Sequence, residues 1–229
     1  MRRLLLLDLD GTLIDTLSFI IHCFQQSVTP LTRRVPSQEE IVATFGPAEV
    51  DCIARLLRRY DSEGLLHQPL NMQQVYQAAD CFHAMYAAGY HEGKVLPYPH
   101  IVETIHAARK WGWATAVFTG KGRTSTDETL AHLGLTASFD AIITSDDIAH
   151  PKPAPDGVLL ACEQTGVAPA QTYFVGDSPT DIHAGKAAGA HSVAAMWGAI
   201  YPEETLSASP ETILHHPSEL QSWLQRITV

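Results

Sequence analysis

From Gly93 to the end of the sequence, short apolar runs alternate with longer segments of helical periodicity. The apolar runs predict strands at residues 113–118, 141–144, 172–175 and 191–196. The segments around them predict helices at residues 101–111, 123–133, 155–165, 179–188 and 217–226. Helices that alternate with strands usually connect parallel neighbours, so this pattern predicts an α/β fold with a doubly wound, mostly parallel, Rossmann-like sheet.

A further strand is predicted at the start of the chain, followed by a long helical insert. Residues 4–9 form an apolar run that leads into an Asp-Leu-Asp-Gly-Thr segment. From Asp15 to about Gly89 apolar residues recur at helical spacing, without the alternation of a strand. We therefore predict a core domain made of residues 1–15 and 93–229, and a helical cap domain of residues 16–92 inserted after the first strand.

Composition and charge narrow the classes of partner. The chain is 45% hydrophobic and carries a formal net charge of −10, so it can bury a core but has no generic attraction to nucleic acid or to an anionic membrane. Its first apolar run stops at Asp8 and Asp10, which favours a buried strand over a signal peptide. The four cysteines are scattered, without a metal-binding or disulfide pattern. We expect a cytoplasmic protein that binds neither nucleic acid nor membrane.

Clusters of polar residues and glycine follow four of the predicted strands, close to the point where each strand ends. They are Asp8 and Asp10 after the first, Thr119 and Gly120 after the second, Lys152 beyond the third, and Asp177 with Asp181 after the fourth. Ligands of such sheets bind beyond the carboxyl ends of the strands, which share one edge. We therefore expect these side chains to converge on one site.

Carboxylates crowded into one site repel each other unless a cation lies between them. Their hard oxygen atoms suit Mg²⁺, which also accepts a substrate phosphate oxygen as a ligand. Lys152 would add positive charge against the phosphate, and one carboxylate could attack phosphorus to form an aspartyl-phosphate. The site therefore predicts a Mg²⁺-dependent phosphohydrolase acting on a small phosphorylated metabolite.

These motifs, in this order, resemble those of the haloacid dehalogenase (HAD) superfamily. They are the Asp-Leu-Asp-Gly-Thr segment at 8–12, Thr119, Lys152, and Gly-Asp-Ser-Pro-Thr-Asp at 176–181, which together cover nearly the whole chain. The insert stands where that superfamily carries a helical cap. The Phe-Gly-Pro segment at 45–47, Pro-Tyr-Pro at 97–99 and His-Pro-Lys-Pro at 150–153 are similar to the phosphoglycolate phosphatase-like group. Gly120 and Lys121 stand where an Asn-Lys pair is common in that group, so Gly120 is a departure from it.

The resemblance implies a role for each motif residue. Asp8 would be the nucleophile, and Asp10 the general acid for the leaving group and later the base for water. Mg²⁺ would be held by the Asp8 carboxylate, the Asp10 backbone carbonyl and Asp177, with Asp181 in support. The phosphate would be bound by Thr119, Gly120 and Gly11, and Lys152 would orient both phosphate and nucleophile.

Several related activities remain as alternatives. Phosphoglycolate is the first substrate that the resemblance implies, and inorganic pyrophosphate or a sugar phosphate comes next. A sugar phosphomutase of the same fold stays open, whereas a dehalogenase would not need Asp10 and Thr12. A phosphonate-cleaving relative needs a cap lysine, and residues 16–92 contain none. A catalytically inactive protein of this fold, used only as a binding partner, would not need the complete set of polar motifs. The sequence leaves the oligomeric state open.

Two features of the insert suggest other chemistry and are interpreted more simply. Cys52 and Arg58 match the C-x5-R spacing of cysteine phosphatases, but the segment between them has no glycine and predicts a helix instead of a phosphate-binding loop. Arg55, Arg58 and Arg59 share one helical flank and are expected to face solvent, with contact to a substrate anion as the less favoured alternative.

Overall fold

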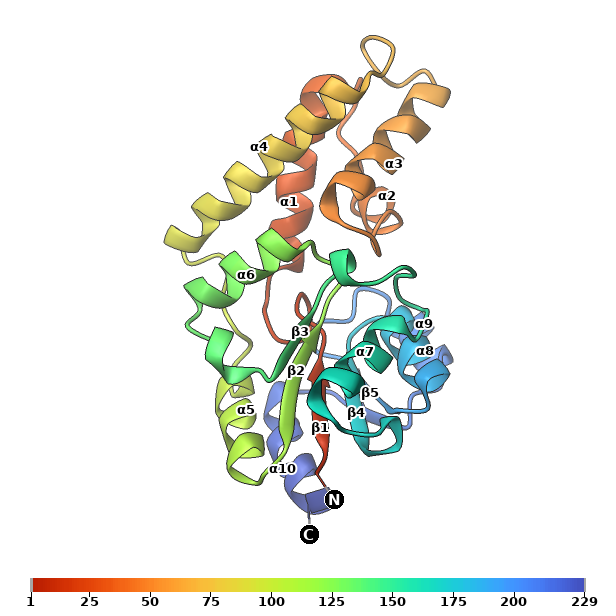
Figure 1. The fold of residues 1–229 in the computed structure, drawn as a ribbon. Coiled ribbons are helices and arrows are strands. Elements are labelled where there is room, and N and C mark those ends of the chain that lie inside the picture. Colours follow the sequence, from red (N-terminus) through yellow and green to blue (C-terminus); the bar gives the residue numbers. More distant parts are fainter. Residues whose placement is uncertain (1, 229) are drawn as a thin grey trace.

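A computed structural model describes residues 2–228 and contains one six-stranded sheet, ordered β3-β2-β1-β4-β5-β6 (Figure 1). Every neighbouring pair of strands is parallel. The strands are β1 (Leu4–Leu7), β2 (Ala114–Phe118), β3 (Ala141–Ile143), β4 (Thr172–Gly176), β5 (His191–Ala195) and β6 (Thr212–Leu214). The parallel, doubly wound α/β architecture is as predicted.

The central strand β1 shows why an unbroken apolar run becomes a strand here. It lies between β2 and β4, and all four of its leucines are fully buried. Successive side chains of a strand point to opposite faces, so Leu5 and Leu7 join one apolar cluster while Leu4 and Leu6 join another. A strand covered on both faces needs apolar residues at every position.

The helices of the sheet region cover its two faces. They are α5 (Ile101–Lys110), α6 (Arg123–His132), α7 (Asp156–Thr165), α8 (Pro179–Ala188), α9 (Pro202–Ser207) and α10 (Pro217–Thr228). Short 3₁₀ turns occur at Thr136–Ser138, Ser145–Asp147 and Pro169–Gln171. In Figure 1, α5 and α10 lie on one side of the sheet, and α7 and α8 lie on the other.

The insert consists of helices joined by loops and stands beyond one end of the sheet (Figure 1). Its elements are α1 (Leu17–Val28), a 3₁₀ turn (Thr29–Leu31), α2 (Gln38–Val42), α3 (Glu49–Ser62) and α4 (Met72–His91). Capping boxes begin two of them, Ser37 with Glu40 at α2 and Asn71 with Gln74 at α4. The longest helix, α4, packs along α1 and α3.

Two elements near the C-terminus were not predicted. Strand β6 has three residues at the edge of the sheet, and its Ile213 is 43% exposed, so it lacks the apolar run of a buried strand. Helix α9 has six residues, too few to show periodicity. The first strand was also predicted too long, because it ends at Leu7 and leaves Asp8 in the following loop. That loop is where the site begins.

Candidate active site

Asp8 and Asp10 enter the site from the loop that follows β1. The backbone N–H of Asp8 donates to the Val175 carbonyl at 2.9 Å, which extends the β1–β4 pairing by one residue and fixes the position of Asp8. The Asp10 carboxylate points elsewhere: it accepts a hydrogen bond from the Thr16 hydroxyl at 2.6 Å and lies 3.5 Å from the Lys121 Nζ. The two carboxylates are therefore held apart, with different partners.

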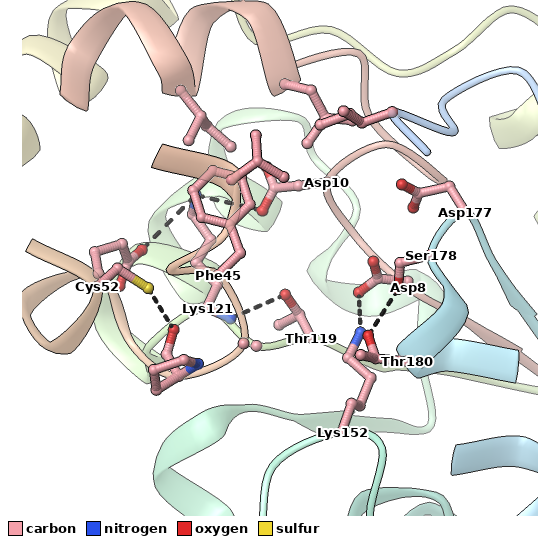
Figure 2. A pocket seen from close by; sticks show the side chains of 18 of the residues that line it. Asp8, Asp10, Phe45, Cys52, Thr119, Lys121, Lys152, Asp177, Ser178 and Thr180 are labelled. Atoms are coloured by element: carbon pink, nitrogen blue, oxygen red, sulfur yellow. Dashed lines mark hydrogen bonds and ion pairs between the residues drawn. The ribbon is translucent and has the colours of Figure 1, made fainter. Parts of the chain in front are cut away.

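Lys152 links Asp8 to Asp181. Its Nζ donates to the Asp8 Oδ1 at 2.8 Å and to the Asp181 Oδ1 at 2.6 Å, and its side chain is 7% exposed. Burial by itself lowers the pKa of Lys152, but the carboxylates of Asp181 and Asp8 outweigh it and the net shift is upward. Lys152 is therefore a fixed ammonium group at the Asp8 carboxylate, as Figure 2 shows.

Asp177 and Asp181 follow β4. Asp177 accepts a hydrogen bond from the Thr12 hydroxyl at 2.8 Å. Asp181 is the third residue of α8 and is fully buried. Its Oδ2 accepts hydrogen bonds from the N–H and hydroxyl of Ser178, at 3.0 and 2.6 Å, while its Oδ1 accepts the one from Lys152. Both oxygens of Asp181 are thus engaged, and it acts on the site through Lys152.

The carboxylates of Asp8, Asp177 and Asp181 form a cluster suited to a hard cation, which Asp8 and Asp177 can bind directly while Asp181 stays hydrogen-bonded to Lys152 and Ser178. Each offers an oxygen atom, and the three atoms lie within 4.8 Å of one another. Burial raises the pKa of Asp8 to about 7 in spite of the opposing charge of Lys152. Burial, together with Asp8 and Asp181, holds the pKa of Asp177 well above its usual range. Negative charge thus exceeds what Lys152 balances, which is the electrostatic condition for a divalent cation held by oxygen ligands.

Thr119 and Gly120 follow β2 on the other side of Asp8. The Thr119 N–H donates to the Ile143 carbonyl at 3.0 Å, and its hydroxyl oxygen accepts from the Lys121 N–H at 3.1 Å. This leaves the hydroxyl proton of Thr119 to donate into the cavity that it lines. A Cβ at Gly120 would lie 2.7 Å from the Gly46 carbonyl oxygen, so Gly120 lets the insert approach the site closely.

Gly11 lies beneath the site, next to Asp177. Its φ is +86°, and a Cβ there would lie 2.5 Å from the Asp177 Oδ2. Gly11 and Asp181 support the site without being among the residues that line its cavity, whereas the other predicted site residues do line it. The structure thus brings Asp8, Asp10, Thr119, Lys152 and Asp177 together.

The insert and the sheet region together line a partly open cavity of about 340 Å³. Leu17, Phe45, Glu49 and other side chains of α1 to α4 line it opposite the carboxylates. The Cys52 thiol borders the cavity but donates to the Thr44 and Pro47 carbonyls, and burial raises its pKa to about 12. Cys52 is a buried residue of α3, and the segment from Cys52 to Arg58 is helical, as predicted.

The arginine flank of α3 faces solvent. Arg55, Arg58 and Arg59 are all exposed, and none of them is among the residues that line the cavity. The guanidinium of Arg59 pairs with the carboxylates of Glu63 and Glu40, at 2.9 and 3.5 Å. The solvent-facing interpretation of this flank is therefore confirmed.

Lys121 is a site residue whose role the sequence did not indicate. Its side chain is 3% exposed, and its Nζ lies 3.5 Å from the Asp10 Oδ2, 3.8 Å from the Glu49 Oε1 and 3.9 Å from the centre of the Tyr86 ring. Burial by itself lowers the pKa of Lys121, and these neighbours, Asp10 foremost, raise it beyond its usual range. Because Glu49 and Tyr86 are distant from Lys121 in the sequence, only the fold reveals these contacts between the insert and the sheet region.

Comparisons with known proteins agree with this geometry. The model of the family "Haloacid dehalogenase-like hydrolase" matches residues 5–195. The chain is 30% identical to the phosphoglycolate phosphatase of Escherichia coli K12, over 93% of this chain and 88% of that protein. It is 29% identical to the pyrophosphatase PpaX of Bacillus velezensis, over 94% and 93% of the two chains.

Solved structures give the same fold. The crystal structure of a predicted phosphoglycolate phosphatase from Haemophilus somnus superposes with a TM-score of 0.84 at 22% identity, covering 99% of this chain and 98% of that one. The motifs, the fold and the family match concur, and the chain belongs to the haloacid dehalogenase-like hydrolases, as an enzyme that hydrolyses phosphate esters.

Proposed function

We propose that the protein is a Mg²⁺-dependent phosphatase that hydrolyses a small phosphate monoester through an aspartyl-phosphate on Asp8. The observation that carries this proposal is the placement of the Asp8 carboxylate in the lining of a partly open cavity, 2.8 Å from the Lys152 ammonium and beside Asp177. An anionic nucleophile next to fixed positive charge is the arrangement that phosphoryl transfer requires.

The residues of the chain divide the work between them. Asp8 attacks phosphorus, and the leaving-group oxygen receives a proton from Asp10, which later accepts one from the water that hydrolyses the aspartyl-phosphate. The Thr119 hydroxyl and the Gly120 N–H donate to phosphate oxygens, and Lys152 holds both phosphate and nucleophile. The Asp8 and Asp177 carboxylates and the Asp10 backbone carbonyl would hold Mg²⁺, which neutralises phosphate charge when bound.

We further propose that residues 16–92 act as a cap over a core made of residues 1–15 and 93–229. The two connections are short and hydrogen-bonded, with the Asp15 N–H donating to the Leu96 carbonyl and the Lys94 N–H to the Gly89 carbonyl, at 2.9 and 3.0 Å. Such a cap would open to admit substrate and close to exclude water. Crystal forms with and without ligand that show the same fully open Asp8 site would contradict this.

Phosphate release tests the proposed function. Wild type is compared with Asp8→Asn, which keeps the size of the side chain but removes the anionic nucleophile, and with Asp127→Asn, a matched change at a side chain that is 52% exposed. Substrates include phosphoglycolate and pyrophosphate, the compounds named for relatives, with Mg²⁺ and with EDTA. We expect release only with Mg²⁺, from wild type and Asp127→Asn. A folded Asp8→Asn protein with wild-type turnover would overturn the nucleophile assignment.

The same assay addresses the alternatives. Turnover of a sugar phosphate to its isomer without phosphate release would indicate a mutase. No turnover of any substrate would indicate a binding protein. We also propose a cytoplasmic location, which four free cysteines support; no helix within residues 2–228 is long and apolar enough to cross a membrane.

A further inference from the structure

The cavity wall that faces the carboxylates is apolar. It is formed by Leu17, Ile20 and Phe24 of α1, Val42 and Phe45 at the end of α2, and Phe82 of α4. The three phenylalanine rings pack together, with centroids 5.7 Å apart for Phe24 and Phe45 and 4.8 Å apart for Phe24 and Phe82. Leu17, Val42 and Phe45 remain only half-buried because they face the cavity. This wall has the surface that would contact the alcohol part of a bound phosphate ester.

The charged groups of the cavity leave no cation for a second anion. Among the described lining residues, four carboxylates (Asp8, Asp10, Glu49 and Asp177) face two ammonium groups. Lys152 is engaged with Asp8 and Asp181, and Lys121 with Asp10 and Glu49. If Mg²⁺ is bound, the phosphate group of the substrate balances the positive charge that the ion adds, and no positive charge is left for a second anion. A carboxylate or a second phosphate would therefore lie in the cavity without a cationic partner, which disfavours its binding.

Glu49, on the insert side of the cavity, also disfavours a substrate with a second anionic group. Its Oε2 accepts a hydrogen bond from the Gly122 N–H at 3.4 Å, and its Oε1 is buried without a hydrogen bond. The acidic side chain that the insert turns toward the cavity is therefore placed to accept hydrogen bonds. It would repel the carboxylate of phosphoglycolate and tolerate a neutral or donor-bearing group.

From these observations we infer that the substrate is a phosphate monoester of an apolar alcohol, about one ring in size, without a second anionic group. This inference rests on the proposed function and departs from phosphoglycolate, the first substrate that the family resemblance implies. The size follows from the cavity of about 340 Å³, which must hold the phosphate as well, since a cavity of roughly 150 Å³ accepts a benzene molecule.

The decisive comparison uses isobutyl phosphate and phosphoglycolate. Both carry a branched group of similar size on a methylene next to the ester oxygen, and only phosphoglycolate carries a second anionic group. We expect kcat/KM for isobutyl phosphate to exceed that for phosphoglycolate by about a hundredfold or more. From methyl to propyl phosphate, each added methylene should raise kcat/KM about fourfold, and benzyl phosphate should be the best of the series. Equal or better turnover of phosphoglycolate would overturn the inference.

Variants test whether the apolar wall is the cause. Phe45→Ala should lower kcat/KM for benzyl phosphate about tenfold or more and leave methyl phosphate, which does not reach the wall, within about threefold. Phe19→Ala is the matched control, because Phe19 lies in the same insert, packs against Tyr86 and does not line the cavity. Glu49→Gln should narrow the preference for isobutyl phosphate over phosphoglycolate by about tenfold. An equal loss for methyl and benzyl phosphate in Phe45→Ala would contradict the proposal.

Binding separates failure of this inference from failure of the proposed function. Calorimetry with Asp8→Asn and Mg²⁺ measures the affinity of each compound without turnover. Suppose that isobutyl and benzyl phosphate bind more tightly than phosphoglycolate but wild type hydrolyses none of them. This result would support the inferred preference for an apolar alcohol and contradict the proposed phosphatase function. Tighter binding of phosphoglycolate would contradict the inferred preference for an apolar alcohol, whichever compounds the wild type hydrolyses.

Discussion

Lys152→Met removes the ammonium group that binds Asp8 and Asp181, and keeps most of the length and apolar volume of the side chain. In the folded protein the two carboxylates, which are 12% and 0% exposed, would then face each other and Asp177 without this cation. Removing one partner of a buried ion pair costs about 3–5 kcal/mol. We expect a loss of that size in the free energy of unfolding, measured in urea with EDTA present.

The loss should depend on pH with a defined sign. The pKa of Asp8 is raised in the folded protein, from 3.8 to about 7, so the folded state binds a proton that the unfolded chain releases. Stability therefore falls as the pH rises from about 4 through 7, and without Lys152 the upward shift is larger. The destabilisation of Lys152→Met should thus be greater at about pH 8 than at about pH 5.

Two further variants make this reasoning refutable. Adding Asp181→Asn to Lys152→Met removes one of the uncompensated charges, so the double variant should recover about 1–3 kcal/mol through coupling of the two sites. Lys110→Met, at an exposed position of α5, should stay within about 0.5 kcal/mol of wild type. A loss below about 1 kcal/mol for Lys152→Met, or one that grows as the pH falls, would refute the electrostatic account of the site.

Three other predictions concern individual side chains. Gly11→Ala should lower the free energy of unfolding and the affinity for Mg²⁺ by more than Gly134→Ala, since both positions have positive φ but only the Gly11 Cβ would collide with a carboxylate; equal urea midpoints and equal Mg²⁺ titrations would contradict this. Thr119→Val should reduce kcat/KM about a hundredfold with its fold intact by circular dichroism, because it removes the hydroxyl proposed to donate to phosphate, and wild-type kinetics would contradict that role. Iodoacetamide near neutral pH should label the exposed Cys81 much faster than Cys52, whose pKa is raised to about 12, as peptide mass spectrometry would show.

The parts of the fold that could be predicted are those that leave a local signal. The leucine run of β1 could be recognised because a strand buried on both faces has apolar residues throughout. The convergence of Asp8, Thr119, Lys152 and Asp177 followed from parallel topology, which places the ends of all these strands at one edge. Local pattern and a general rule of topology were sufficient for both.

The parts that could not be predicted depend on contacts between distant segments. Lys121 reads as an ordinary loop lysine until the fold brings Glu49 and Tyr86 of the insert against it. Nothing in the local sequence shows that Phe24, Phe45 and Phe82 form one wall, because they lie on three separate helical segments. The edge strand β6 was missed for another reason: a three-residue strand with an exposed isoleucine has no apolar run that a sequence pattern could reveal.

Trapping the phosphorylated enzyme tests the central claim most directly. Wild-type enzyme is mixed with Mg²⁺ and with benzyl phosphate that carries radioactive phosphorus. The reaction is quenched with acid within one turnover, and the protein is digested for peptide mapping. We predict an acid-stable, base-labile phosphoryl group on the peptide that contains Asp8, absent from Asp8→Asn. Continued phosphate release by Asp8→Asn, or a covalent label on another residue, would contradict the account.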